Sequence, residues 1–205
     1  CCSSHLRKYG KEVKGNSRMT GIFRPDTKII DIISQGRFTI SAEVIPPRNG
    51  TPESQILDQI RQLTEFGAQF LSVTKGAGGS LRAGSLPIAQ IIKDHFKIPV
   101  IAHFTCRDLT PEEVENQLID HHYFGIRNIL GLRGDPPSEV DDTSVKWNSY
   151  PYAYQLINQI QQLNKGQYLE RKGFISKNNT KTDFCIGAAA YPDAPTSTER
   201  IQHFK

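Results

Sequence analysis

Short apolar runs and amphipathic stretches alternate five times along this chain of 205 residues. Each apolar run is rich in Val, Ile, Leu and Phe and is bounded by polar, Gly or Pro residues, as is typical of buried strands. The amphipathic stretches repeat their apolar residues at helical spacing. Regular alternation of strand and helix predicts an α/β fold whose neighbouring strands pair in parallel through right-handed crossovers. The expected strands cover residues 37–45, 68–76, 98–106, 126–134 and 183–191.

The segments between these strands carry helix signals. The third of them begins with Thr110, and Glu113 follows at the spacing of a capping box. His121 and His122 near its end have no ligand partner at helical spacing, so we expect them at the surface. The expected helices cover residues 51–66, 86–96, 110–124 and 152–163.

Residue parity along the strands favours a (β/α)8 TIM barrel over an open doubly wound sheet. On the first strand the face of Val44 is apolar, whereas the face of Glu43 is polar. On the fourth strand we expect Leu130 to face the helices and Gly131 to face the interior. An open sheet covered by helices on both sides would need two apolar faces. Eight units typically take about 250 residues, so we expect this chain to hold roughly the first five.

Charge is concentrated at the start of the chain. The first 18 residues carry five Lys or Arg and one Glu, whereas the rest of the chain holds 20 basic and 20 acidic residues. We therefore expect a basic leader and lead-in over residues 1–35 and the barrel over residues 36–205. A neutral barrel argues against a nucleic-acid partner, and no apolar run is long enough to span a membrane. Four cysteines without zinc-like spacing favour a reduced, cytoplasmic setting and no metal site.

Polar residues gather where the expected strands end, which is the face on which barrel enzymes build their active sites. Glu43 needs an explanation above all, because an unpaired carboxylate in an apolar strand is costly. Each residue also has an ordinary structural explanation: Glu43 could pair with Arg48 or Arg133, and His103 could be a core histidine. In chain order the strand-end residues are Glu43, Thr74, His103, Cys106, Arg133, Asp135 and Tyr191.

Five motifs occur in one order along the chain: "AEVIPPR", "FLSVTKGAGGS", "PVIAHFTCRD", "GIRNILGLRGDPP" and "IGAAAYPD". Their order and spacing over about residues 36–205 resemble those of the methylenetetrahydrofolate reductase family. The resemblance implies a barrel that holds FAD and reduces 5,10-methylenetetrahydrofolate to 5-methyltetrahydrofolate with NAD(P)H, the hydride passing through the flavin. It also implies a cytoplasmic flavoprotein oxidoreductase of one-carbon metabolism and methionine biosynthesis, with a small folate substrate and a possible homo-oligomer.

The resemblance gives individual residues roles. Glu43 matches the family's general acid, which protonates N10 of the substrate and opens the imidazolidine ring to an iminium ion. A carboxyl group can hold its proton near neutral pH when it is desolvated, so we expect Glu43 to be shielded from water. Asp135 matches the aspartate that contacts both flavin and folate, and its charge would favour the cation. The positions that match FAD contacts are Thr74, Lys75, Ala77, His103, Arg133, Gly134, Asp135, Ala153 and Tyr191.

Departures from the family pattern leave an alternative open. Many members read "GGSTRD" where this chain reads "GGSLRA", and Ala194 stands where a histidine is common. The family's folate-binding glutamine on strand six would lie beyond Lys205. The alternative is a non-catalytic or incomplete flavin-binding barrel that serves as a regulatory or assembly subunit. A barrel methyltransferase is disfavoured, because the cysteines do not supply the thiol ligands that its zinc would need.

Overall fold

The computed structural model describes residues 23–49, 52, 54–76, 84–135, 149–171 and 179–190. Five parallel strands form one sheet in the order β1-β2-β3-β4-β5. The expected strands and their parallel pairing are therefore confirmed, although each strand is shorter than its apolar run. The bounds are β1 Ser41–Val44, β2 Phe70–Val73, β3 Val100–Thr105, β4 Asn128–Leu132 and β5 Cys185–Ala188.

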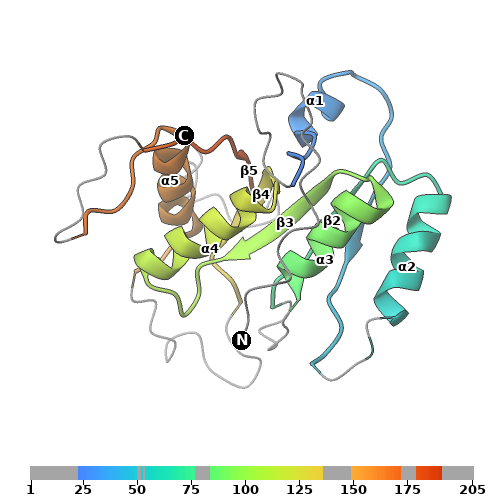
Figure 1. The fold of residues 1–205 in the computed structure, drawn as a ribbon, viewed down its shortest axis with the longest axis horizontal. Helices are drawn as coiled ribbons and strands as arrows, with labels where there is room; N and C mark the ends of the chain where they lie inside the picture. Colours follow the sequence, from blue (N-terminus) through green and yellow to red (C-terminus); the bar gives the residue numbers. More distant parts are fainter. Residues whose placement is uncertain are drawn as a thin grey trace, which may run out of the picture.

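A helical segment follows each of the first four strands. Figure 1 shows these segments crossing the sheet in chain order, from α2 on the right to α5 on the left. The expected capping box is present: the Thr110 N–H donates to Glu113 Oε2 at 2.8 Å, and the Glu113 N–H donates to Thr110 Oγ1 at 3.2 Å. The helices are α1 Ile29–Ile33, α2 Ser54–Glu65, α3 Ser85–Ile91 with its π-helical continuation η2 Ile92–Phe96, α4 Pro111–Tyr123 and α5 Ala153–Asn164.

The two faces of the sheet differ in burial. Along β2 and β3 fully buried residues alternate with half-buried ones. Val73, Val100 and Phe104 have no exposed surface and belong to the hydrophobic core, whereas Ser72 and His103 on the other face are half-buried. The expected division into an apolar, helix-covered face and a more polar face is confirmed on these strands.

The expected orientation of β4 is wrong. A Cβ added to Gly131 would lie 3.1 Å from Cγ1 of Ile157 on α5, so Gly131 faces the helical layer. Leu130 and Leu132 are half-buried on the opposite face, where a Cβ added to Gly187 would lie 3.2 Å from Leu130 Cδ1. The missing side chain at Gly131 allows the close approach of α5, and this packing decides the parity of the strand.

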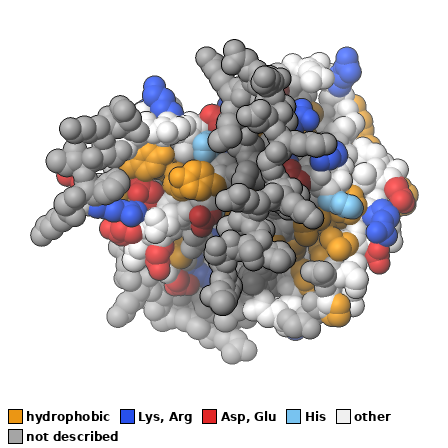
Figure 2. Space-filling model, viewed as in Figure 1, with side chains coloured by type: hydrophobic (Ala, Val, Ile, Leu, Met, Phe, Trp, Pro, Cys, Tyr) orange, Lys and Arg blue, Asp and Glu red, His pale blue; other side chains and the backbone are white. Residues whose placement is uncertain are grey.

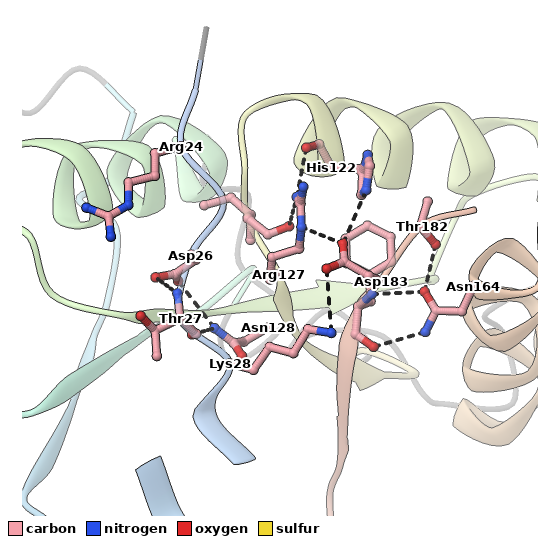
Figure 3. A network of polar contacts seen from close by, with 12 residues as sticks. Arg24, Asp26, Thr27, Lys28, His122, Arg127, Asn128, Asn164, Thr182 and Asp183 are labelled. Atoms are coloured by element: carbon pink, nitrogen blue, oxygen red, sulfur yellow. Dashed lines mark hydrogen bonds and ion pairs between the residues drawn. The ribbon is translucent and has the colours of Figure 1, made fainter. Parts of the chain in front are cut away.

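The lead-in segment, residues 23–29, lies across the N-terminal ends of β3 and β4 (Figure 3). Asn128 is 2% exposed; its Nδ2 donates to the Val100 carbonyl at 3.1 Å, and its Oδ1 accepts from the Ile29 N–H at 2.8 Å. The Asp26 carboxylate accepts from the Val100 N–H at 2.9 Å and from Asn128 Nδ2 at 3.2 Å. Burial nevertheless raises the pKa of Asp26 to about 6, because desolvation of the charged form outweighs these donors.

A second polar group at the same end of the sheet surrounds Asp183, which precedes β5 (Figure 3). Its carboxylate lies 2.6 Å from Arg127 Nε, 3.4 Å from His122 Nε2 and 3.5 Å from Lys28 Nζ. These contacts connect the lead-in segment, α4 and β4 to the start of β5. We call the two groups together the basal network: Asp26, Lys28, His122, Arg127, Asn128 and Asp183.

The described surface mixes charges of both signs on the face shown in Figure 2. This agrees with the equal numbers of acidic and basic residues outside the first 18 positions. Within the described ranges, no helix combines the length and apolar character that a membrane span needs. The same ranges contain no group of three or more His, Cys, Asp or Glu side chains that could hold a metal ion.

Candidate functional site

The C-terminal ends of the strands lie along one rim, because all five strands run parallel. Most of the residues expected at the site lie on this rim. Ala153 is the first residue of α5 and belongs to the same side, since α5 runs back from the end of β4. Ala77 and Tyr191 fall outside the described residues. The described rim residues are Glu43, Thr74, Lys75, His103, Cys106, Arg107, Arg133, Gly134 and Asp135.

The fold brings Glu43 on β1 and His103 on β3 together across β2. Glu43 pairs with Ser72 on β2, and Ser72 pairs with Ile101 on β3. His103 lies two residues beyond Ile101, on the same face of the sheet and nearer to the rim. Glu43 Oε2 is 3.7 Å from His103 Nε2. Burial lowers the pKa of His103, and this effect exceeds the opposite influence of Glu43. The imidazole is therefore mainly neutral at pH 7.

Glu43 is more exposed than its expected role requires. Its side chain is 55% exposed, whereas that of His103 is 11% exposed. The reason is the position of β1, which forms one edge of the described sheet and pairs there with β2 alone. A single half-buried neighbour does not remove the carboxyl group from water.

Thr74 carries an unsatisfied polar atom at the end of β2. The residue is 5% exposed, and its N–H donates to the Val44 carbonyl at 3.0 Å. Its Oγ1 is buried and has no hydrogen-bond partner among the described parts of the chain. A buried hydroxyl without a partner costs about 1–3 kcal/mol, so a polar ligand atom at this point would be favourable.

The ammonium group of Lys75 is directed into the layer between β3 and α4. Lys75 Nζ donates to Gln117 Oε1 on α4 at 2.8 Å and lies 4.4 Å from the centroid of the Phe104 ring. Burial lowers the pKa of Lys75 to about 8. The expected surface position of His121 is wrong, because the residue is 4% exposed and packs edge-on against the Phe104 ring. Helical spacing alone did not show which side of α4 faces the sheet.

Cys106, directly after β3, forms hydrogen bonds with the end of β4. Its side chain is buried, and its thiol donates to the Leu132 carbonyl oxygen at an Sγ···O distance of 3.5 Å and to that of Arg133 at 3.7 Å. Burial raises the pKa of this thiol to about 11. The group is therefore protonated at pH 7, and as a thiol it is a poor nucleophile and a poor metal ligand.

The segment after β4, residues 133–135, carries the three expected residues Arg133, Gly134 and Asp135, and we call it the β4 exit. Gly134 has φ +96°, which lies in the region that favours glycine. Asp135 is exposed, and its carbonyl accepts a hydrogen bond from Nη1 of Arg107. Arg107 was missed from the sequence, although a cation directly after the third strand is a signal that it belongs to the rim.

The family model described as methylenetetrahydrofolate reductase matches residues 28–203, which include the whole described sheet and its rim. This chain belongs to the methylenetetrahydrofolate reductase family. The family expected from the five motifs is therefore confirmed.

Curated relatives agree with the family match. Methylenetetrahydrofolate reductase 2 of Schizosaccharomyces pombe is 32% identical over 166 residues, which are 80% of this chain and 23% of the relative. Methylenetetrahydrofolate reductase (NADH) 1 of Arabidopsis thaliana is 29% identical over 167 residues, or 82% of this chain and 26% of the relative. The 5,10-methylenetetrahydrofolate reductase of Escherichia coli (strain K12) is 29% identical over 168 residues, which are 82% of this chain and 49% of the relative. The chain thus spans about a quarter to a half of the relatives' lengths.

Proposed function

We propose that the protein containing this chain reduces 5,10-methylenetetrahydrofolate to 5-methyltetrahydrofolate, with NAD(P)H as the electron source and FAD as its cofactor. Family membership over residues 28–203 supports this reaction, and one plant relative is named for NADH. The observation that carries the proposal is the pair of Glu43 and a neutral His103, 3.7 Å apart on the rim. Such a pair offers an acid beside a neighbour that does not force it to ionise.

We further propose that the sheet is the first part of a (β/α)8 barrel. A doubly wound sheet reverses its strand order at a switch point, whereas β1 to β5 follow one another without reversal. The helices cover the apolar face, and the opposite face carries half-buried residues such as Ser72 and His103. A barrel wall likewise has unreversed strand order, helices on its outer face and side chains that fill its interior on the other.

The rim residues suit a phosphate-containing flavin cofactor. The Thr74 hydroxyl has no partner within the described ranges, and the fork of the Arg133 guanidinium matches phosphate oxygens. Gly134 gives the β4 exit its positive φ, and a Cβ there would meet Arg107 and Thr105. A bound flavin supplies the hydride chemistry, for which the side chains have no equivalent. The residues proposed to hold it are Thr74, Lys75, Ala77, His103, Arg133, Gly134, Asp135, Ala153 and Tyr191.

The proposed roles of the chain's own residues concern a proton and a charge. Glu43 donates its proton to N10 of the folate, which opens the ring. Folate packed over the rim would exclude water from Glu43. His103, neutral beside it, adds no positive charge that would favour the carboxylate. Asp135 presents a negative charge that stabilises the cationic form of the opened substrate.

The test is Glu43→Gln, which keeps the shape of the side chain and removes its proton. In anaerobic stopped-flow experiments we expect nicotinamide to reduce the bound flavin at the parent rate. Reoxidation by methylenetetrahydrofolate should slow by about 10³-fold, within the range that general acid catalysis contributes. Glu65→Gln at the exposed end of α2 is the matched control and should leave both half-reactions unchanged.

Two outcomes would contradict the proposal. A parent-like rate of folate reduction in Glu43→Gln would remove the proton-donor role. A yellow parent protein that no nicotinamide can bleach would instead favour the non-catalytic flavin-binding subunit.

A further inference from the structure

Arg107 hydrogen-bonds to two residues of the β4 exit and lies beside the third. Its N–H donates to the Arg133 carbonyl at 3.0 Å. Its Cβ would lie 3.1 Å from a Cβ added to Gly134, so the two backbones are in close contact. Its Nη1 donates to the Asp135 carbonyl. One residue therefore hydrogen-bonds the first and third residues of the β4 exit and lies against the second.

The Arg107 side chain is itself held in place. It is 12% exposed, and its Nε lies 3.0 Å from Oδ2 of Asp108. Asp108 has φ +61°, in the left-handed region that Asp and Asn tolerate better than most residues. This carboxylate balances the charge of the largely buried guanidinium, which would otherwise be costly to desolvate. A side chain restrained at two points can fix the segment that it contacts.

We infer that Arg107 is a positioning residue for Asp135. The guanidinium binds the carbonyl of Asp135, an exposed residue, and so restrains the backbone from which the carboxylate extends. The effect on catalysis rests on the proposed function, because it presumes that Asp135 acts on the folate. A displacement of about 1 Å can cost about 10²-fold in rate, so loss of this restraint should act through Asp135.

The inference predicts a selective effect on one half-reaction. Asp135 is one of nine positions proposed to contact the cofactor, and Arg107 binds Arg133 through its backbone N–H, which the substitution keeps. Removal of the guanidinium should therefore change flavin binding and reduction by nicotinamide much less than it changes folate reduction. A merely structural arginine would instead lower stability and both half-reactions together.

The test variant is Arg107→Met, which keeps an apolar stem and removes the donors. Hydrogen exchange followed by mass spectrometry on the flavin-loaded protein should show amides of the β4 exit exchanging about tenfold faster, as expected when a local restraint is lost. Folate reduction should slow by about 10- to 100-fold, as in Asp135→Asn, while flavin reduction changes less than about twofold. Arg107→Lys, which can still donate to the carbonyl, should recover part of the rate.

Two further variants test the role of Asp108 and the effect of removing an unrelated arginine. Asp108→Asn keeps a residue that tolerates positive φ and removes only the charge that restrains Arg107, so it should show a weaker form of the same effect. Arg61→Met is the matched control, because Arg61 is exposed on α2 and pairs only with Asp58 among the described residues. It should change neither exchange at the β4 exit nor either half-reaction.

The inference and the proposed function fail in different ways. Unchanged exchange in Arg107→Met would overturn the inference. Faster exchange with unchanged folate reduction, while Asp135→Asn is slow, would overturn the positioning role and leave the proposed function standing. If the parent does not reduce the folate, the proposed function and the catalytic part of the inference fall together, whereas faster exchange would still support the physical restraint.

Discussion

The two ends of the sheet satisfy their polar groups differently. In the basal network Asn128 is 2% exposed and bonded through both ends of its amide, and Asp26 accepts from three donors. At the rim the Thr74 hydroxyl has no partner among the described residues, and Glu43 is 55% exposed. Groups satisfied within the chain stabilise the fold, whereas groups left unsatisfied are available to a ligand.

This difference implies that the two ends should respond to mutation in opposite ways. Changes in the basal network should alter the free energy of unfolding and leave the half-reactions of the folded protein alone. Changes at the rim should alter the half-reactions with little effect on stability.

The largest effect on stability is expected for Asn128→Ala. The substitution removes hydrogen bonds to three backbone groups, the Ile29 N–H and the Thr27 and Val100 carbonyls, and one to the Asp26 carboxylate. We expect the free energy of unfolding, measured by urea titration, to fall by about 3–4 kcal/mol. Asn158→Ala, at an exposed position on α5, is the control and should change stability little. A fall in the free energy of unfolding of less than about 1 kcal/mol would show that water enters the basal network and replaces the hydrogen bonds of the Asn128 amide.

The second effect concerns the dependence of stability on pH. Burial raises the pKa of Asp26 from its ordinary value of 3.8 to about 6, so the folded state holds this proton more tightly than the unfolded state. The resulting stabilisation is fully present below about pH 4 and is lost as the pH rises through about 6. The loss should be on the order of 3 kcal/mol.

Asp26→Asn removes this titration, and its unfolding free energy should therefore vary less between pH 4 and pH 7 than that of the parent. Asp58→Asn removes an exposed carboxylate on α2 and is the control. An unaltered pH dependence in Asp26→Asn would mean that the three donors, rather than burial, decide the protonation of Asp26.

The smallest effect is expected at the rim from His103→Lys. A permanent positive charge near Glu43 favours the carboxylate, so folate reduction at pH 7 should slow by about tenfold and its optimum should move to lower pH. Stability should change little compared with the basal variants. His95→Lys, on the exposed side of η2, is the control. An unshifted pH profile in His103→Lys would show that the two side chains do not interact during catalysis.

The sequence was sufficient for features that depend on local pattern. Alternation of apolar runs predicted five parallel strands, and the Thr110–Glu113 spacing predicted a capping box that is present. Strand-end position identified Glu43 and His103, which the fold brings together. These signals rest on residues close in the chain or on the common direction of parallel strands.

The features that escaped sequence reasoning depend on partners far away in the chain. Gly131 faces the helices because Ile157 packs against it. His121 is buried because α4 turns that side towards Phe104. Neither the contact of Arg107 with the β4 exit nor the basal network has a spacing that a single sequence displays.

The basal network also constrains the order in which the chain can be assembled. Ile29 and Asn128 are 99 positions apart, yet their hydrogen bond ties the lead-in segment to β4. During synthesis the lead-in segment leaves the ribosome long before β4 exists, so this bond cannot form until 99 further residues have followed. Until then the lead-in segment lacks its bonds to Asn128, and a nascent chain stalled before β4 should be open to proteases and chaperones at that end.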